Sequence, residues 1–222
     1  MEEIDKIIRT KRTGIALQIT DDATLIVRAP LDIDTFTIEN IVLKHKKWIE
    51  KKKKEILSRD PKFSRKKFVD GENFLYLGES YRLTIVDDKT PLKFENRFYL
   101  SKEYQTMAKE IFIKWYKEKA HEKISERVQW YASKKGLKYS KINITNDQKR
   151  WGSCSPNGNL NFSWRLIMAP LSVIDYVVVH ELIHLEERNH SKSFWLKVKT
   201  LMQDYEIYKK WLRYNGYLLR IE

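Results

Sequence analysis

Cysteine, glycine, proline and long apolar runs are all scarce in this 222-residue chain. These shortages limit the classes of protein to which the chain can belong. Cys154 is the only cysteine, so no internal disulfide can form. No apolar run is long enough to span a membrane, and the first residues, MEEIDKIIRTKR, contain no apolar signal segment. No low-complexity linker appears. The composition predicts a cytoplasmic protein that does not enter membranes and that buries its own core, as one domain or two small ones.

Histidine is also scarce, but three of the 5 histidines cluster in one short stretch. His180 and His184 frame the motif HELIH, and His190 follows six positions later. On an α-helix His180 and His184 lie one turn apart on the same face, so both imidazoles can reach one metal ion. Glu181 flanks that face, where a zinc hydrolase places its general base. The motif therefore predicts a zinc site with a catalytic carboxylate beside it.

The residues around this motif are apolar enough to predict a buried helix. Between 174 and 185 only two side chains are acidic and none is Lys or Arg, and a helix apolar nearly all round belongs in a core. We expect it to begin within 171–174, because Pro170 ends the preceding segment and Ser172 with Asp175 matches the capping-box spacing. Its three consecutive valines would also suit a buried strand. A strand, however, would hold the two motif histidines about 13 Å apart, too far to share a metal.

A third ligand requires the chain to turn soon after the motif. If the helix continued, His190 would lie about 9 Å farther along the axis than His184 and could not reach the same ion. The helix is therefore expected to end between Leu185 and His190. Asn189 tolerates the left-handed conformation that often ends helices, so it is the expected turning residue. Ser191 is then placed to cap a second amphipathic helix.

The segments HELIHLEERNHSKSFW, RWGSCSPNGNLNFSWRLIMAP and VIDYVVV resemble the YgjP-like metallopeptidase family, small zincins related to the WLM and SprT-like proteins. The resemblance extends over the whole chain and is most specific from Arg150 to Trp195. It implies three zinc ligands and a catalytic acid/base, namely His180, His184, His190 and Glu181. The third-histidine spacing is also that of metzincins, which have glycine where Glu187 stands. The resemblance further implies that an edge strand aligns an extended peptide substrate.

The hydrophobic pattern predicts an α+β fold in two parts. Residues 1–100 are expected to form a β-hairpin-rich region with one lysine-rich helix, which Asp34 caps. Residues 101–222 are expected to form a zincin-like catalytic region with a small sheet, a long helix and the buried HExxH helix. The boundary near residue 100 rests on the change from hairpins to helical spacing.

Turn residues and apolar spacing place the individual elements. Strands are expected at 14–19, 24–28, 67–69, 73–77, 81–86, 92–94, 98–100 and 141–145. The long helix should run from Lys102 to about Lys135 and end at Gly136. Its apolar residues at helical spacing predict a core face rather than a ligand box. A hairpin should follow from Gln148 to Arg165, turning at 156–158.

The net charge of +13 and the pI near 9.6 raise the question of a polyanionic partner. Most of the lysines at 44–54 fall in one predicted helix, and a solvated lysine-rich helix face explains them better than a dedicated binding patch. No zinc-finger or RNA-recognition motif accompanies the charge. Nucleic acid is therefore kept only as a secondary partner. The sequence does not indicate an oligomeric state.

Several residues near the motif have weaker claims to a role. Asp204 and Glu206 could replace the third histidine as ligand, as carboxylates do in gluzincins, but neither has a signature spacing. Stabilisation of an oxyanion needs a second electrophile, and sequence spacing does not choose among Tyr208, Tyr214 and Arg150.

The RWGSC segment raises a similar choice. Arg150 and Trp151 could contact substrate or brace the zinc helix, and bracing is the favoured interpretation. Cys154 is expected to be a small buried thiol rather than a nucleophile, because no histidine free of metal binding can be paired with it.

Three function classes follow from these observations. The favoured one is a zinc metallopeptidase that acts on peptides or proteins, with Glu181 as general base. The second is a metal-dependent hydrolase of a phosphoester or phosphoanhydride, which the basic charge would suit. The third is a nucleic-acid-associated protein with a structural metal site. Glu181 argues against the third, because a closed structural site needs no adjacent base and usually has four protein ligands.

Overall fold

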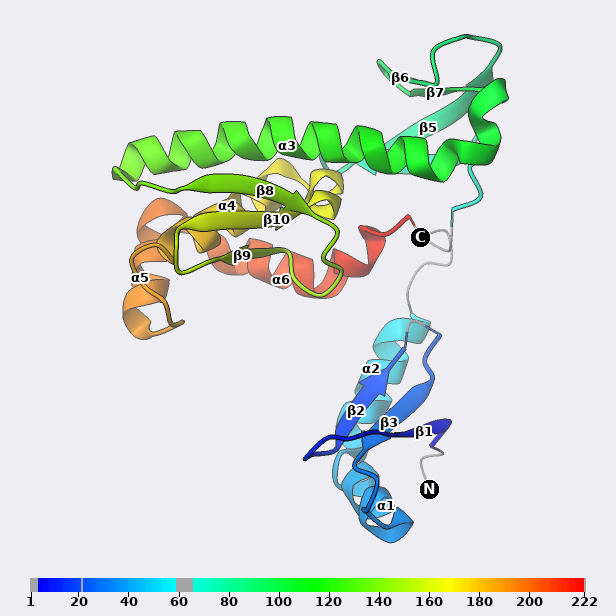
Figure 1. Ribbon diagram of the computed structural model, residues 1–222, viewed down its shortest axis with the longest axis vertical. Coiled ribbons are helices and arrows are strands. Elements are labelled where there is room, and N and C mark those ends of the chain that lie inside the picture. The colour runs from blue at the N-terminus through cyan, green and yellow to red at the C-terminus, as the bar shows by residue number, and fades with distance from the viewer. Residues whose placement is uncertain (1–3, 21, 59–65, 222) are drawn as a thin grey trace. The chain divides into compact units, whose positions relative to one another are not determined.

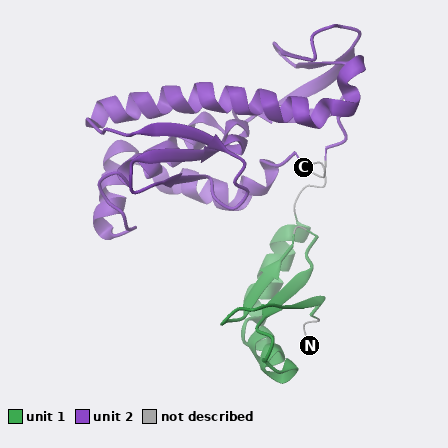
Figure 2. Cartoon of the chain, in the orientation of Figure 1, with its two compact units in different colours: residues 1–64 green, residues 65–222 purple. Residues whose placement is uncertain are grey.

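The computed structural model describes residues 4–20, 22–58 and 66–221, and the chain divides into two compact units, 1–64 and 65–222 (Figure 2). Within the described ranges, no helix is both long enough and apolar enough to cross a membrane.

The first unit is a three-stranded sheet with two helices. Its strands are β1 (Lys6–Arg9), β2 (Ala16–Ile19) and β3 (Leu25–Ala29). The central strand β3 runs parallel to β1 and antiparallel to β2. Alternate residues of β3 are buried in a small core with residues of both helices, as expected for a strand with one covered face. The expected strands β2 and β3 are confirmed, and β1 is additional.

The lysine-rich segment forms two helices rather than the one expected. They are α1 (Thr35–Lys44) and α2 (Lys46–Leu57). The cap at Asp34 is confirmed, because its carboxylate accepts a hydrogen bond from the Thr37 backbone N–H at 2.7 Å. The break falls at His45, whose backbone leaves the helical region and whose ring Nδ1 lies 2.8 Å from the Ile41 carbonyl oxygen.

The second unit begins with a four-stranded sheet in the order β4-β5-β7-β6. Its strands are β4 (Asn73–Tyr76), β5 (Glu79–Val86), β6 (Leu92–Phe94) and β7 (Phe98–Ser101). All four match expected strands. The strand expected at 67–69 is not formed, because the Glu72 carboxylate accepts the backbone N–H groups of Lys67 and Phe68 and Phe68 has a positive φ of 56°.

A long helix connects this sheet to the rest of the unit (Figure 1). A 3₁₀ turn, η2 (Lys102–Met107), leads into α3 (Ala108–Lys135), which ends at Gly136 with φ 69° as expected. Buried positions recur mostly every fourth residue along α3: Ala108, Phe112, Tyr116, Ala120, Ile124, Val128, Tyr131 and Ala132. Because four residues exceed one turn of 3.6, this stripe winds about 40° per step around the helix. Different faces of α3 therefore serve different partners along its length.

The first half of α3 packs on the four-stranded sheet through aromatic rings. The Phe112 ring stacks on Phe74 at 4.3 Å between centroids and lies 5.0 Å from Phe98. These contacts put the strands between Phe68 and Ser101 in the same core as α3. By compactness the chain thus divides at 64/65, whereas the sequence pattern placed its division near residue 100.

The second half of α3 covers a small three-stranded sheet and the motif helix. The sheet has the order β8-β10-β9, formed by β8 (Lys141–Thr145), β9 (Gly152–Cys154) and β10 (Asn159–Ser163). β10 runs parallel to β8 and antiparallel to β9, so β9 is an edge strand. The expected strand and hairpin are both confirmed. The remaining elements are η3 (Trp164–Met168), α4 (Leu171–Ile183), α5 (Lys192–Leu201), α6 (Tyr205–Asn215) and η4 (Gly216–Leu218).

The motif segment is a buried helix, not a strand. α4 begins at Leu171, within the expected range, and ten of its thirteen residues are buried. The expected capping box is wrong, because α4 has no side-chain cap. Asp175 instead accepts two hydrogen bonds from Arg127 of α3, at 2.6 and 2.8 Å. A tertiary ion pair thus replaces the local cap and ties α3 to α4.

Candidate metal centre and its pocket

The chain turns sharply after α4, which ends at Ile183 with His184 as its C-cap. The backbone N–H groups of Glu186 and Glu187 both donate to the Ile183 carbonyl, at 3.0 and 2.9 Å. The turn therefore tightens by short-range hydrogen bonds. The left-handed residue expected at Asn189 is wrong, since Asn189 is not among the described residues with positive φ.

Glu187 anchors this turn to the next helix. Its carboxylate accepts a hydrogen bond from the Ser193 hydroxyl at 2.9 Å and pairs with Lys197 at 3.0 Å. Lys197 also pairs with Glu186 at 3.0 Å. The helix α5 starts as expected, because the Ser191 hydroxyl accepts from the Phe194 N–H at 3.3 Å. Glutamate at 187, where metzincins have glycine, therefore fixes the turn by side-chain contacts rather than by a left-handed backbone.

This turn brings the three motif histidines together. One ring nitrogen from each of His180, His184 and His190 lies within 4.8 Å of the others. His180 Nε2 and His190 Nε2 are 2.9 Å apart. His184 Nδ1 lies 2.9 Å from the Glu187 carbonyl oxygen, which fixes the ring and leaves Nε2 free to bind a metal. Among the described residues, this is the one His/Cys/Asp/Glu group able to hold an ion.

Aromatic rings of α5 hold the imidazoles in place. The Phe194 ring centroid lies 4.9, 4.6 and 4.7 Å from those of His180, His184 and His190. The Trp195 ring stacks on His190 at 5.7 Å and on Tyr205 at 5.2 Å. The cluster is thus backed by apolar side chains on the α5 side.

Glu181 lies beside the imidazoles and is only 5% exposed. Its side chain fits against the backbone of Gly152 on β9. A Cβ atom on Gly152 would lie 2.6 Å from Glu181 Oε1 and 2.7 Å from its Cγ. Glycine is therefore required at 152 for Glu181 to occupy this place. This explains one residue of the RWGSC segment by a contact across 29 positions of sequence.

Burial sets the protonation states of the cluster. Burial, followed by the neighbouring His184, His190 and Lys209, lowers the pKa of His180 to about 3. Burial also lowers the pKa of His190, with His184 and Lys209 adding to the shift. Both rings are therefore neutral near pH 7, the form that binds metals. Burial raises the pKa of Glu181 to about 8, opposed by Arg150, and a divalent cation nearby would favour its carboxylate form.

The donor set fits a divalent metal. Three imidazoles around a tetrahedral ion at 2.0–2.1 Å lie about 3.3 Å apart, so small side-chain adjustments suffice. Two facing ring nitrogens at 2.9 Å repel when both are unprotonated, and a cation between them removes that repulsion. His180 Nε2 is the nitrogen of this ring that faces His190, so Nε2 is the atom placed to bind the metal. The adjacent carboxylate leaves the fourth position for substrate or water.

A pocket of about 360 Å³ opens beside this cluster. Its walls come from α4, from the RWGSC segment and from α6. The lining residues are Arg150, Trp151, Gly152, Tyr176, Val177, His180, Glu181, Lys209, Leu212 and Arg213. Sequence reasoning missed Tyr176, which lies on α4 one turn before His180. It also missed Lys209 and Arg213, because only the packing of α6 on α4 brings them to the motif.

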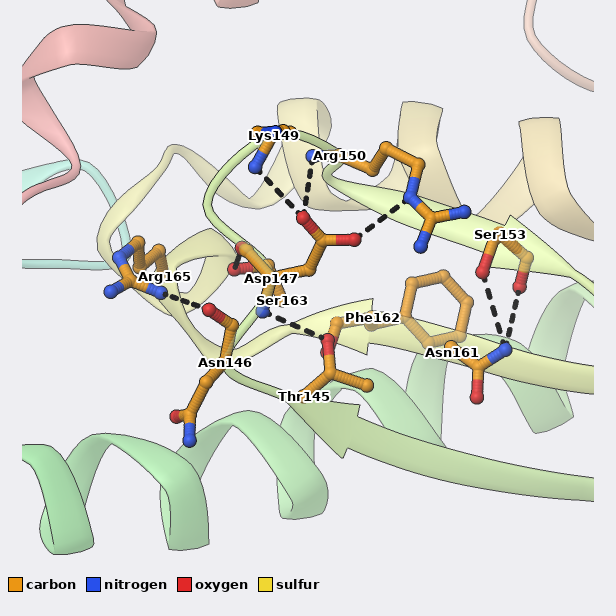
Figure 3. A network of polar contacts seen from close by, with 10 residues as sticks. All are labelled: Thr145, Asn146, Asp147, Lys149, Arg150, Ser153, Asn161, Phe162, Ser163 and Arg165. Carbon is orange, nitrogen blue, oxygen red and sulfur yellow. Dashed lines mark hydrogen bonds and ion pairs between the residues drawn. The ribbon is translucent and has the colours of Figure 1, made fainter. Parts of the chain in front are cut away.

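Arg150 is held at this pocket by a polar turn (Figure 3). Asp147 accepts the backbone N–H groups of Lys149 and Arg150, at 2.8 and 3.2 Å, and the Arg150 Nε at 2.8 Å. The Ser163 hydroxyl donates to the Asp147 carbonyl at 2.9 Å and joins the turn to β10. Arg150 therefore keeps its two terminal nitrogens for other contacts.

Among the other sequence candidates, neither acidic residue joins the imidazole cluster. Asp204 is the N-cap residue of α6, and the exposed Glu206 accepts from the Tyr205 hydroxyl at 3.3 Å. Neither belongs to the metal-competent group. Tyr208 and Tyr214 do not line the pocket, whereas Arg150 does.

Cys154 is half-buried on β9 and packs against the core. Burial raises the pKa of its thiol, opposed by Arg188. A raised pKa keeps the thiol protonated, which supports the packing interpretation.

Comparison of the sequence with protein families shows the family of this chain. The model of the YgjP-like metallopeptidase domain matches residues 13–215. No curated protein matches the sequence. Among solved structures, the metallopeptidase zymogen abylysin of Pyrococcus abyssi is 18% identical, with a TM-score of 0.39 over 44% of this chain and 96% of its own. Jannalysin of Methanocaldococcus jannaschii, also a zymogen, is 20% identical, with a TM-score of 0.37 over 43% and 96%. Because the family match covers most of its length, the chain belongs to the YgjP-like metallopeptidase family and is a metal-dependent peptidase.

Proposed function

We propose that this chain is a zinc peptidase in which His180, His184 and His190 bind the metal and Glu181 is the general base. One observation carries the proposal: the turn after α4 gathers three imidazoles next to a buried carboxylate at the wall of a pocket. Three neutral ligands leave the charge of the ion uncompensated. A zinc ion held there would supply Lewis-acid activation of the attacking water and of the scissile carbonyl.

The residues of the chain have distinct tasks in this mechanism. Glu181 takes a proton from the attacking water and returns it to the leaving amine. Gly152 keeps that carboxylate in its place by leaving room for it. Arg150, fixed by Asp147 at the pocket, is the residue best placed to stabilise the oxyanion.

Strand β9 is the proposed substrate strand. It pairs with β10 on one side, and no other described strand pairs with its second edge, where an extended peptide would add as a further strand. The substrate would lie along the strand that begins at Gly152, directly against Glu181. This proposal includes zinc as the metal and the binding mode of the peptide. It also includes the roles given to the three histidines, Glu181, Gly152 and Arg150.

The experiment separates ligands from base. His180→Ala and His184→Ala should lose stoichiometric zinc, measured by atomic absorption, whereas Glu181→Gln should keep it and lose on the order of 10²-fold to 10⁴-fold in rate. His190→Ala should bind zinc more weakly and regain activity in part when zinc is in excess. His121→Ala, an exposed histidine on α3, is the matched control and should change neither property.

Activity is measured on casein-like peptides and, in parallel, on nucleotides. Cleavage of peptides but not nucleotides supports the proposal, and the reverse supports a phosphoester or phosphoanhydride hydrolase. Peptide hydrolysis by Glu181→Gln at the wild-type rate would show that the general base is wrongly assigned. Full zinc content in both His180→Ala and His184→Ala would show that the metal ligands are wrongly assigned.

A further inference from the structure

The pocket beside the proposed metal site has a strongly one-sided charge. Arg150, Lys209 and Arg213 line it, and among the described lining residues only Glu181 is acidic. We propose that Lys209 and Arg213 form a carboxylate-binding subsite, so that this enzyme prefers peptides presenting an acidic side chain or a free C-terminus near the scissile bond. This inference rests on the proposed peptidase function and names its substrate class.

The two cations are built into one face of α6. Lys209 and Arg213 are one turn apart, and Leu212 of the same face lines the pocket between them. The helix is fixed by burial of Tyr205 and Leu212. The Lys209 ammonium lies 3.8 Å from the centroid of the Trp195 ring, which itself stacks on His190. The first cation of the pair therefore stands close to the imidazole cluster.

Neither cation is neutralised within the described chain. No described acidic side chain forms an ion pair with Lys209 or Arg213, although Lys119 and Lys123, which are partly buried, each pair with a glutamate three residues on. Glu206 lies one turn before Lys209, but its carboxylate accepts from the Tyr205 hydroxyl. Two like charges one turn apart repel each other, and a bound anion relieves that repulsion.

The rest of the lining suits a peptide side chain. The pocket offers apolar surface to the methylene groups of a substrate side chain, from Trp151, Val177 and Leu212. The two cations would bind the carboxylate at the end of that side chain. The pocket of about 360 Å³ has room for one side chain and part of its backbone. It opens beside Gly152, where the proposed substrate strand begins, so an anchored carboxylate would lie near the reacting bond.

The test uses zinc-loaded full-length protein and peptides of one sequence that differ at single positions. Glu, Gln and Lys are compared on each side of the cleaved bond, and each peptide is made with a free and with an amidated C-terminus. We expect a carboxylate to raise kcat/KM by about 10-fold to 100-fold, mainly through KM, as a charge-assisted contact would. If Glu raises kcat/KM in amidated peptides, the subsite binds the side-chain carboxylate. If the increase in kcat/KM is lost on amidation, the subsite binds the C-terminal carboxylate.

Variants connect the preference to the two residues. Lys209→Ala and Arg213→Ala should each reduce the ratio of Glu to Gln cleavage, or of free to amidated cleavage, and Arg213→Glu should shift preference toward Lys peptides. Lys210→Ala is the matched control, because Lys210 is exposed on the same helix and does not line the pocket. It should keep both the rate and the ratio.

The outcomes separate this inference from the function it rests on. Peptide cleavage that depends on Glu181 but shows no carboxylate preference, or a preference that survives Lys209→Ala combined with Arg213→Ala, overturns the subsite alone. If no peptide is cleaved, the proposed function fails, and the subsite is decided by binding. Zinc-loaded Glu181→Gln should still bind fluorescent Glu peptides about 10-fold or more tighter than Gln peptides, or peptides with a free C-terminus tighter than amidated ones. Equal Kd values in both comparisons would overturn the carboxylate-binding subsite.

Discussion

The contact between Glu181 and Gly152 shows how closely single residues constrain the proposed site. Any side chain at 152 would occupy space that the Glu181 carboxylate fills. No other acidic group lines the pocket in the part of the chain that the structure describes, so a displaced Glu181 has no substitute there. The smallest possible addition to the chain, one methyl group, therefore tests whether the position of this carboxylate matters.

Gly152→Ala should retain the fold and zinc but lose at least about 10-fold in kcat, because Glu181 must move to admit the methyl group. Activity, zinc content and circular dichroism give the three readouts. Gly14→Ala is the control, since a Cβ at Gly14 meets no atom within 4 Å. Full activity of Gly152→Ala would mean that Glu181 works equally well from another position.

Cys154→Ala should stay active, because its half-buried thiol packs on the core and carries a raised pKa. A stability loss of about 1 kcal/mol is expected from the lost packing, measured by urea unfolding. A folded, zinc-loaded Cys154→Ala without activity would instead make the thiol part of the chemistry.

The ligand set could be proposed from sequence because its information is local. Two histidines four residues apart share a helix face, and the third follows six residues later, after the helix has ended. Lys209 and Arg213 carry no such signal, since two cations at helical spacing are common on solvated faces. Only the packing of α6 against α4 gives them a pocket. Gly152 was equally hidden, because its partner lies on another element.

At the scale of elements, local rules predicted the helix termini that depend on neighbouring residues and missed those that depend on contacts with another element. Gly136 ended α3 and Ser191 capped α5 as expected. The capping box at Ser172 failed because Asp175 gains more from two charge-assisted hydrogen bonds to Arg127 than from a helix terminus. Asn189 failed for a related reason, since Glu187 ties the turn to α5 without a left-handed residue.

The Arg127–Asp175 pair should be one of the stronger links between elements. Both side chains are mostly buried, so Asp175→Ala leaves a cation without its partner and should cost about 2–4 kcal/mol. Glu126→Ala removes the exposed Lys123–Glu126 pair of the same helix and should cost under about 1 kcal/mol. Urea unfolding measures both, and equal losses would contradict a structural role for the buried pair.

At the scale of the whole molecule, two separate cores predict two unfolding events. The buried apolar residues of 1–64 and of 65–222 form distinct clusters. Calorimetry should therefore resolve two transitions, of which the larger belongs to residues 65–222.

A chelator should shift only the larger transition, because all three proposed ligands lie in that unit. At a zinc concentration 1,000 times Kd the bound ion contributes about 4 kcal/mol, which corresponds to roughly 10 °C in Tm. A chelator shift in the smaller transition, or none in either, would contradict the site.

The positive charge of the chain is distributed unevenly between these units. Residues 1–64 contain 14 Lys and Arg against 11 Asp and Glu, while residues 65–222 contain 29 against 19. Most of the excess therefore lies in the unit that carries the pocket, where an acidic substrate offers a use for it. A nucleic-acid partner stays a prediction from composition alone.

The winding stripe of α3 has a consequence for how this chain can change in length. Inserting one residue in the middle of α3 would rotate everything beyond it by about 100° and shift it by 1.5 Å. Phe112 could then still face the four-stranded sheet, but Arg127 would point away from Asp175 and the small sheet would lose its cover. A helix that packs on two sheets in this way fixes the number of residues between its two contact faces. Relatives of this protein should accordingly vary in length in their hairpin loops, and should keep the number of residues between Phe112 and Arg127 constant.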